Sequence, residues 1–216
     1  MKNIHIVKEE EFMRRERNGI QSVTPKFNKW FESFMEGKNK SLKIVDLGCG
    51  NGNVLKLLKG MGFRNLTGVE LSEGMIRHSM AYAKIKRHDL ESPLPFPGGS
   101  FDLAIAKDIC EHIINIEQFI SEASRILKPG GVLVIGGPNL KSIYHRLRIL
   151  MGNTEHISIN FGIAHMRWVS YDIFRRWLGP YFTFKPVIFE WYARATPNLL
   201  ARSCNIICVK KTHTGN

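Results

Sequence analysis

Short apolar runs alternate with amphipathic stretches along most of this chain. The apolar runs predict strands near residues 43–47, 65–70, 84–88, 101–106, 131–136, 183–191 and 204–210. Apolar positions at helical spacing predict helices near residues 52–60, 73–82, 116–127, 140–151 and 171–178. Strands and helices in alternation, with short connections, favour an α/β fold in which helices cover both faces of a mostly parallel sheet. We therefore expect a three-layer αβα sandwich.

A further helix is predicted ahead of the first strand. The dipeptide Thr24-Pro25 suits the cap and first turn of a helix. An aromatic stripe at positions i, i+3, i+4 and i+7 follows, made of Phe27, Trp30, Phe31 and Phe34. Such a stripe usually packs against a core. We interpret residues 1–40 as an N-terminal helical cap and residues 41–216 as the main domain.

The first strand breaks into three glycines, Gly48, Gly50 and Gly52, before the next helix begins. Glycine allows a tight turn and the close approach of a ligand, and the free N–H groups of a helix N-terminus point to the same place. A dinucleotide site needs Gly-x-Gly-x-x-Gly, whereas the third glycine here comes one residue early. Asp46 precedes the turn, where its charge disfavours a pyrophosphate and favours a cationic ligand. Because such turns also occur without a ligand, the motifs that follow are needed to decide.

Four later motifs continue the pattern. They are the strand Asn65-Leu66-Thr67-Gly68-Val69-Glu70, the tetrapeptide Arg87-His88-Asp89-Leu90, the segment from Pro93 to Asp102, and the segment from Arg125 to Ile135. Together with Asp46–Gly52, they resemble the class I methyltransferases that use S-adenosylmethionine (SAM), in the group of the ubiquinone and menaquinone biosynthesis enzymes (methyltransferase type 11). The resemblance covers roughly residues 41–136. Its cofactor carries a sulfonium and an ammonium, as the acid at position 46 favours.

The resemblance implies a Rossmann-like sheet of seven strands, the last of them antiparallel and inserted beside its predecessor. It implies that SAM, and the product S-adenosylhomocysteine, lie at the carboxyl ends of the strands. Glu70 is expected to accept hydrogen bonds from the ribose hydroxyls, and Asp89 from the adenine amino group. The expected cofactor-binding residues are Asp46, Gly48, Cys49, Gly50, Asn51, Gly52, Glu70, Leu71, Met75, Asp89, Leu90 and Lys107. The N-terminal helix can cover the mouth of such a site.

Lys107 is unusual after the fourth strand, because relatives often carry a small or neutral residue there. A cation beside the sulfonium would be repelled. Its ammonium therefore either pairs with Asp108 or Glu111, which we favour, or holds an anionic substrate.

Methyl transfer rests largely on alignment and on excluding water, so no fixed set of catalytic side chains is expected. A general base is needed only where the acceptor keeps its proton at neutral pH. Our candidates are His112, His165 and Tyr171. His165 and Arg167 lie in a substrate-side insertion at about residues 137–170, where they either contact the acceptor or tie the loop to the sheet.

Charge is concentrated at one end of the sequence. Residues 137–216 hold eleven Lys and Arg against three acids, which is +8 of the total of +12, whereas residues 41–136 hold eleven against ten, which is +1. The excess indicates an anionic substrate, a nucleic acid or an anionic membrane surface, or else a solvated basic face.

The cysteines Cys49, Cys110, Cys204 and Cys208 show neither disulfide nor zinc spacing, and no metal site is expected. We expect free thiols, with Cys204 and Cys208 in the core. No apolar run approaches the roughly 20 residues of a membrane span, and the polar N-terminus lacks a signal-peptide core. The sequence therefore predicts a cytoplasmic protein of undetermined oligomeric state.

Three functions fit these observations. The favoured one is methyl transfer to a small or lipid-like acceptor, which is anionic in one reading and enclosed by aromatics such as Trp168, Trp177 and Trp191. An RNA methyltransferase that uses the basic last third is the alternative. It is not favoured, because neither a separate RNA-binding module nor an Asn-Pro-Pro-Tyr-type motif is present. A SAM-binding partner subunit without its own chemistry is the third.

Overall fold

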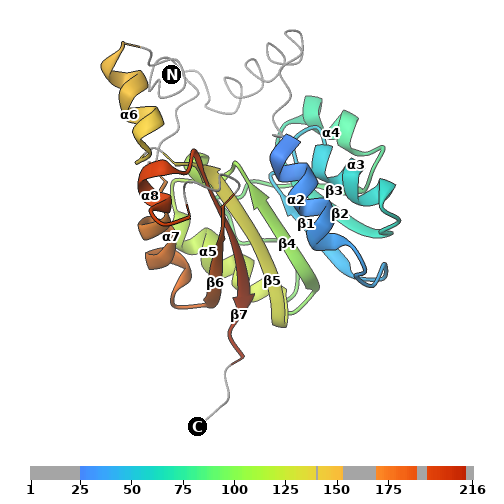
Figure 1. Cartoon of the computed structure of the whole chain (residues 1–216). Coiled ribbons are helices and arrows are strands. Elements are labelled where there is room, and N and C mark those ends of the chain that lie inside the picture. Colours follow the sequence, from blue (N-terminus) through green and yellow to red (C-terminus); the bar gives the residue numbers. More distant parts are fainter. Residues whose placement is uncertain (1–24, 140, 153–168, 189–193, 213–216) are drawn as a thin grey trace.

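A seven-stranded sheet forms the centre of the computed structural model, which describes residues 25–139, 141–152, 169–188 and 194–212 (Figure 1). The strand order is β3-β2-β1-β4-β5-β7-β6. The strands are β1 (Lys43–Leu47), β2 (Asn65–Glu70), β3 (Lys84–Arg87), β4 (Phe101–Lys107), β5 (Leu127–Pro138), β6 (Phe182–Val187) and β7 (Ser203–Lys210). Only β7 runs antiparallel, and it is inserted between β5 and β6. The expected α/β fold and the place of its last strand are confirmed.

Helices cover both faces of the sheet (Figure 1). The helices are α2 (Pro25–Met35), α3 (Asn53–Gly60), α4 (Glu73–Ser79), α5 (Ile116–Ile126), α6 (Ile143–Leu150), α7 (Tyr171–Leu178) and α8 (Pro197–Leu200), with a 3-10 turn, η1 (Cys110–His112). Alternate strand residues face opposite ways: Ile44 packs in one core cluster with α2 and α3, whereas Val45 packs in another with α5 and α7. Two cores on either side of one sheet make the three layers.

Several predicted boundaries differ from the observed ones. Strand β5 begins four residues earlier than predicted, because Leu127 already pairs with Phe101 ahead of the Pro129-Gly130-Gly131 segment. Helix α4 ends at Ser79 instead of residue 82, and α6 starts at Ile143 instead of residue 140. The predicted strand 183–191 corresponds to β6, which ends at Val187, and residues 189–193 lie outside the described part. The short elements η1 and α8 were not predicted.

The aromatic stripe of α2 packs on the core, as predicted. Phe27 and Phe31 are fully buried, and their rings stack with centroids 5.4 Å apart. Trp30 and Phe34 pack at the edge of the same cluster. Helix α2 therefore packs against the sheet. The part of the predicted N-terminal cap before residue 25 lies outside the described residues.

The segment between β3 and β4 is held by one arginine on α5. The Arg125 guanidinium donates hydrogen bonds to the carbonyl oxygens of Leu94 and Phe96 at 2.9 and 2.8 Å. Glu122 pairs with Arg125 and accepts the Leu94 N–H at 2.7 Å. The segment from Pro93 to Asp102 and the segment that begins at Arg125 are separate motifs in the sequence, and in the structure they form one unit.

All four cysteines are free and buried, and Cys204 and Cys208 are core residues as predicted. Within the described residues, no helix has both the length and the apolar character needed to cross a bilayer.

Candidate functional site

The turn between β1 and α3 is fastened to the end of β2. The backbone N–H groups of Gly48 and Cys49 both donate to the Val69 carbonyl oxygen, at 2.9 and 3.0 Å. Gly52, the residue ahead of α3, has φ +82°, and a Cβ there would lie 2.9 Å from the Ser79 Cβ on α4. Glycine is therefore required at position 52 both for its backbone angle and for the approach of α4.

Glu70 ends β2 beside this turn, and its carboxylate already accepts three backbone hydrogen bonds. One oxygen accepts the Gly50 N–H at 2.9 Å. The other accepts the N–H groups of Leu71 and Ser72 at 2.8 and 2.9 Å. A carboxylate has about four acceptor positions, so capacity for a further donor remains. Glu70 thus holds the glycine turn in shape, a role that the sequence did not predict.

Asp46 lies on β1 below the turn and is 3% exposed. Burial, together with the negative charge of Glu70, raises the pKa of its carboxyl to about 7. The buried Asp46 carboxyl beside the half-buried Glu70 favours a cation nearby, because a positive charge would stabilise the ionised form of Asp46. The carboxyl groups of Asp46 and Glu70 therefore fit the sulfonium and ammonium of SAM better than they fit a pyrophosphate.

Other expected cofactor residues surround the same turn. Among the described residues, a Cβ on Gly50 would meet the Met75 sulfur alone, at a van der Waals distance of 3.7 Å. The Cys49 side chain packs over Gly68, and burial raises the pKa of its thiol well above the usual range. Asn51 is half-buried within the turn itself. Cys49, Gly50, Asn51 and Met75 therefore lie together at the turn between β1 and α3.

Asp89 and Leu90 follow β3, further along the same edge of the sheet. One Asp89 carboxylate oxygen accepts the Glu91 N–H at 3.0 Å, and the Asp89 carbonyl accepts the Ser92 N–H at 3.1 Å. Leu90 is 9% exposed and packs in the core with Leu94. The chain after β3 is therefore held in a turn that carries the Asp89 carboxylate.

Lys107 ends β4 and forms an ion pair with Asp108, as the sequence predicted. Its ammonium also lies 5.3 Å from the centre of the Phe27 ring of α2. Asp108 has φ +52°, a left-handed backbone conformation that is uncommon outside glycine. The first turn of α2 therefore reaches the carboxyl end of β4.

The sequence named Glu111 as one possible partner of Lys107 but not as a site residue. It lies in η1, is 2% exposed, and its Oε2 atom has no hydrogen-bond partner among the described residues. A Cβ on Gly137 of β5 would lie 3.0 Å from that oxygen. Burial, and then the charge of Asp108, raises the pKa of Glu111 to about 8. A carboxyl that keeps its proton at neutral pH thus lies where β4 and β5 end.

The two catalytic candidates among the described residues, His112 and Tyr171, lie in different elements, η1 and α7. His112 is half-buried in η1, directly after Glu111. The Tyr171 hydroxyl faces the carbonyl oxygens of Val187 and Ser203, at 3.3 and 3.2 Å, and so joins α7 to β6 and β7. This geometry argues against Tyr171 as a base and for a structural role. His165 lies outside the described residues, as do Arg167, Trp168 and Trp191.

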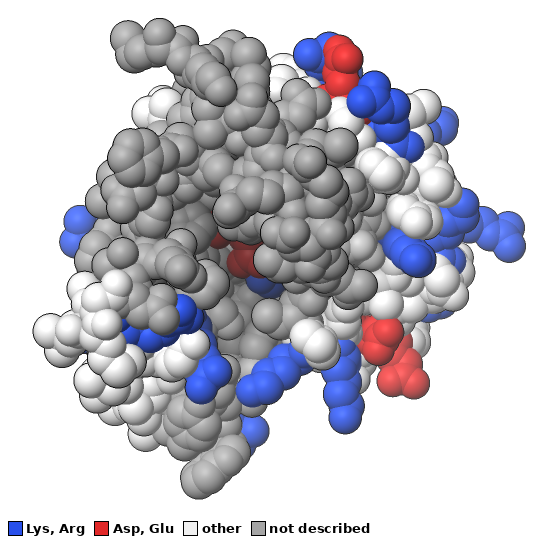
Figure 2. Space-filling view, turned by 90° about the horizontal axis from the view of Figure 1, so that it is seen from above, with Lys and Arg blue, Asp and Glu red and all other residues white. Residues whose placement is uncertain are grey.

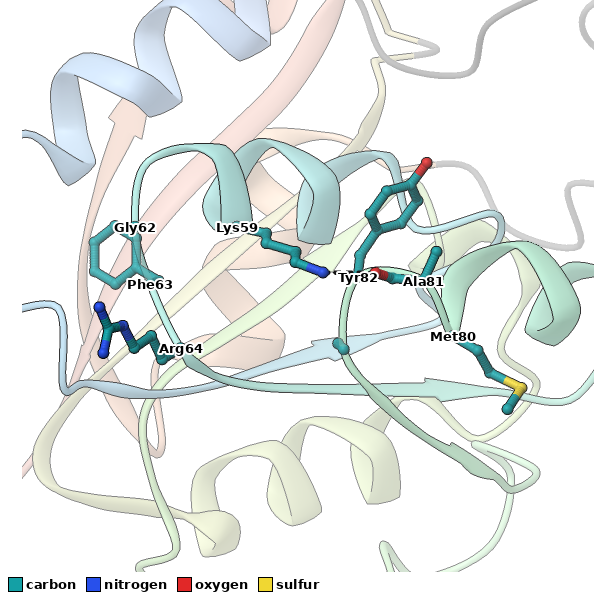
Figure 3. A pocket seen from close by; sticks show the side chains of 8 residues that line it. Lys59, Gly62, Phe63, Arg64, Met80, Ala81 and Tyr82 are labelled. Carbon is teal, nitrogen blue, oxygen red and sulfur yellow. Dashed lines mark hydrogen bonds between the residues drawn. The ribbon is translucent and has the colours of Figure 1, made fainter.

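The carboxyl edge of the sheet is seen from above in Figure 2. Acidic and basic atoms are visible together near the middle of this face. A separate pocket lies elsewhere, between the end of α3 and the connection from α4 to β3 (Figure 3). Lys59 crosses it and donates to the Ala81 carbonyl at 2.8 Å. Since Gly62, Phe63 and Arg64 line this pocket ahead of β2, it is distinct from the glycine turn at the opposite edge.

Comparison with known proteins agrees with this geometry. Residues 45–135 match the family described as "Methyltransferase domain". The chain is 33% identical over 98 residues to a "Probable S-adenosylmethionine-dependent methyltransferase" of Mycolicibacterium smegmatis, covering 44% of this chain and 38% of the relative. It is 32% identical over 109 residues to a ubiquinone biosynthesis O-methyltransferase of Rickettsia canadensis, covering 48% and 46%. The chain thus spans less than half the length of these two relatives.

Solved structures share the whole fold. A SAM-dependent methyltransferase of Thermotoga maritima, described as a possible histamine N-methyltransferase, superposes with a TM-score of 0.69 at 18% identity and covers 97% of this chain and 100% of its own. A chain from the complex of the Haloferax volcanii Trm112 methyltransferase activator with a methyltransferase gives 0.68 at 17%, covering 99% and 100%. Residues 45–135 are thus similar to the methyltransferase domain, and the sheet topology is the Rossmann-like fold of these solved methyltransferases.

Proposed function

We propose that this chain transfers the methyl group of SAM to the hydroxyl of a small or lipid-like acceptor. The observation that carries the proposal is the joint placement of Asp46, Glu70 and the glycine turn at one end of β1 and β2. A hydroxyl acceptor is supported by the relatives that are named ubiquinone biosynthesis O-methyltransferases.

The residues of this chain would divide the work of binding. Asp46 would face the positive charge of the cofactor, and Glu70 would offer its remaining acceptor capacity to the ribose. Asp89 would accept from the adenine amino group, and Leu90 would provide an apolar contact beside it. Bound SAM supplies an electrophilic methyl carbon on a sulfonium, which is already a good leaving group.

Alignment is the main contribution that this chain can make to the rate. Holding two reactants in line corresponds to about 7–11 kcal/mol of the barrier in ideal cases. The η1 segment and the ends of β4 and β5 would form the wall on the acceptor side, with Lys107 engaged by Asp108 and so kept from the sulfonium.

A hydroxyl acceptor must lose its proton, and two neighbouring side chains are suited to this. Of the three bases that the sequence suggested, His112 is the one that remains a candidate within the described residues. Below about pH 8 the protonated Glu111 carboxyl can donate a hydrogen bond to the acceptor oxygen, and above that pH its carboxylate can take up the proton of the acceptor.

Calorimetric titration with SAM and with S-adenosylhomocysteine tests the cofactor, with NAD as the control. We expect micromolar binding of both sulfur nucleotides and none of NAD. Binding of NAD alone would contradict the proposal. Screening of phenols and lipid-like acids for methylation by radiolabelled SAM would then test the acceptor.

RNA and a non-catalytic role are the alternatives. Methylation of RNA by this chain, with no turnover of small acceptors, would replace the proposed acceptor. SAM binding without turnover of any acceptor, followed by turnover when a partner protein is added, would favour the role of a SAM-binding subunit. The Haloferax volcanii neighbour belongs to such a complex with an activator.

A further inference from the structure

Helix α6 carries its apolar residues on the side that faces solvent. Ile143, Leu147, Leu150 and Met151 lie on one face at positions i, i+4, i+7 and i+8, and their exposed fractions are 44%, 49%, 82% and 73%. The sequence predicted this apolar face but not its direction. A helix of a globular protein normally turns its apolar stripe toward the core. Exposed apolar patches of this kind mark interaction sites.

The inner side of α6 is polar instead. His145 is the buried residue of the helix, and its Nε2 atom lies 3.3 Å from the Arg202 carbonyl oxygen. The Ser142 hydroxyl accepts the His145 N–H at 3.4 Å and so caps the helix. The helix packs against α8, beside the start of β7. Its orientation is therefore fixed by polar contacts, and the outward apolar face is a property of the folded chain.

Basic side chains border the apolar face. Arg146 lies on one side of it by helical position and Arg148 on the other. The Arg202 guanidinium lies 4.2 Å from the centre of the Tyr144 ring, next to Arg148. In Figure 2 the coloured atoms along the left side, where Figure 1 shows α6, are those of Lys and Arg. We call Ile143, Leu147, Leu150 and Met151, with Arg146, Arg148 and Arg202, the α6 patch.

We propose that the α6 patch binds the surface of an anionic lipid bilayer, with α6 lying in the plane of the interface. An interfacial helix needs an apolar face that enters the boundary between headgroups and acyl chains, and basic residues that meet anionic headgroups. The α6 patch supplies both. The +8 charge of residues 137–216 adds attraction of the same sign.

Other occupants fit the patch less well. A second copy of the chain would bring two like-charged patches together around a two-fold axis, and the arginines would repel one another. RNA recognition uses open aromatic faces for stacking, whereas the Tyr144 ring is covered by Arg202. The protruding apolar side chains of Leu150 and Met151 would be buried in the acyl region of a bilayer.

The position of α6 gives membrane binding a consequence for access. In Figure 1 the helix lies above the carboxyl ends of the strands, the same edge that carries Glu70 and Glu111. A bilayer held by α6 would therefore lie on the side from which an acceptor reaches this edge. Lipid binding itself does not depend on methyl transfer.

Vesicle flotation of the full chain tests the proposal. Vesicles of phosphatidylcholine with about 30% phosphatidylglycerol should carry the protein upward, and vesicles of phosphatidylcholine alone should carry much less. Raising the NaCl concentration from about 0.1 M to about 0.5 M should weaken the binding, because the headgroup charge is screened.

Two pairs of variants locate the contact. Leu150→Glu/Met151→Glu should weaken binding at least tenfold, whereas Met80→Glu, on an apolar residue that is 63% exposed at the end of α4, should not. Arg146→Gln/Arg148→Gln should weaken it by about fivefold per charge removed. Arg64→Gln/Lys84→Gln removes the same charge at the opposite edge and should have a smaller effect.

Several results would overturn the proposal. Equal flotation with and without phosphatidylglycerol would do so, and so would equal effects of the variants at the two edges. Size-exclusion chromatography with light scattering addresses a second copy: a dimer that Leu150→Glu/Met151→Glu converts to a monomer, without vesicle binding, would assign the patch to self-association. Salt-sensitive RNA binding that is lost in the arginine variants, without vesicle binding, would assign it to nucleic acid.

Discussion

The carboxylate of Glu70, at the end of β2, accepts the backbone N–H of Gly50 at 2.9 Å. A residue twenty positions away thus sets the shape of the glycine turn between β1 and α3. The side chain that we propose to contact the ribose also holds the backbone that we propose to bear the cofactor, so binding and local structure would depend on the same group.

Replacing Glu70 with glutamine is expected to weaken SAM binding by at least tenfold. The amide has one acceptor oxygen where the carboxylate has two, and a hydrogen bond to a charged group contributes about 1.5–3 kcal/mol. Titration calorimetry measures the loss. Glu73→Gln is the matched control, because Glu73 forms a surface ion pair with Arg87 and should leave the affinity unchanged. Equal affinities for all three proteins would remove Glu70 from the site.

Replacing Gly52 with alanine is expected to lower the free energy of unfolding by more than about 2 kcal/mol. The left-handed backbone costs about 1–2 kcal/mol for any residue with a Cβ, and the new atom would also meet Ser79 at 2.9 Å. Gly62→Ala provides the control, since Gly62 has φ +89° and a Cβ there would meet no atom of the described residues within 4 Å. Urea denaturation compares the two. A loss at Gly52 no greater than that at Gly62 would show that α4 can move aside.

SAM binding is expected to strengthen as the pH rises from about 6 to about 8. The pKa of Asp46 in the free protein is about 7, so below that pH a proton must leave before the carboxylate can face a cation. Titrations in buffers of different ionisation enthalpy should reveal proton release on binding. Asp46→Asn should bind SAM more weakly and lose this proton release. Release that persists in Asp46→Asn would assign the proton to another group.

Stability is expected to fall with rising pH between about 4.5 and about 8 because of Glu111. Its folded pKa is raised from 4.5 to about 8, so in this range the native state binds more protons than the unfolded state. The stabilisation present at low pH is therefore lost as pH approaches the folded pKa, by up to about 1.4 kcal/mol per pH unit.

Glu111→Gln provides the test of that assignment. It resembles the neutral acid, so it should change stability little at pH 5 and should exceed the wild type at pH 9. Chemical denaturation across this range measures both curves. Parallel curves for the two proteins would show that Glu111 titrates normally.

Replacing Tyr171 with phenylalanine is expected to cost about 0.5–1.5 kcal/mol of stability and to leave SAM affinity and turnover unchanged. Its hydroxyl contacts the backbone of β6 and β7, so the loss should appear in unfolding alone. Tyr181→Phe, at a tyrosine that is 36% exposed, is the control and should cost less. A fall in turnover at unchanged stability would restore Tyr171 as a catalytic candidate.

Much of this fold could be predicted because its signals are local. Apolar runs and glycines predicted the strands and the turn, and the motif from Asp46 to Gly52, with the motifs after it, carried the resemblance from which the cofactor is proposed. The direction in which α6 faces could not be predicted, since periodicity identifies an apolar face but not the partner that it meets. The two short elements, η1 and α8, are too brief to leave a pattern.

Some features of the candidate site could likewise be predicted from the sequence, and others could not. An acid at the end of a strand identified Glu70, but its hydrogen bonds to Gly50, Leu71 and Ser72 depend on how β2 meets the turn. Glu111 stands between two short apolar pairs, Ile109-Cys110 and Ile113-Ile114, and this pattern does not say which way its side chain points. Its burial results from the packing of η1 against β5, which brings together residues 26 positions apart.

The insertion of β7 between β5 and β6 has a consequence for how the chain is made. Strand β6 hydrogen-bonds only to β7 within the described sheet, yet it is synthesised first. Co-translational folding can therefore assemble the five strands from β3 to β5 while β6 still has no place to dock. The edge of β5 stays open until Ser203–Lys210 emerge, and during that interval it is the surface on which a nascent chain would meet a chaperone or another unfinished copy.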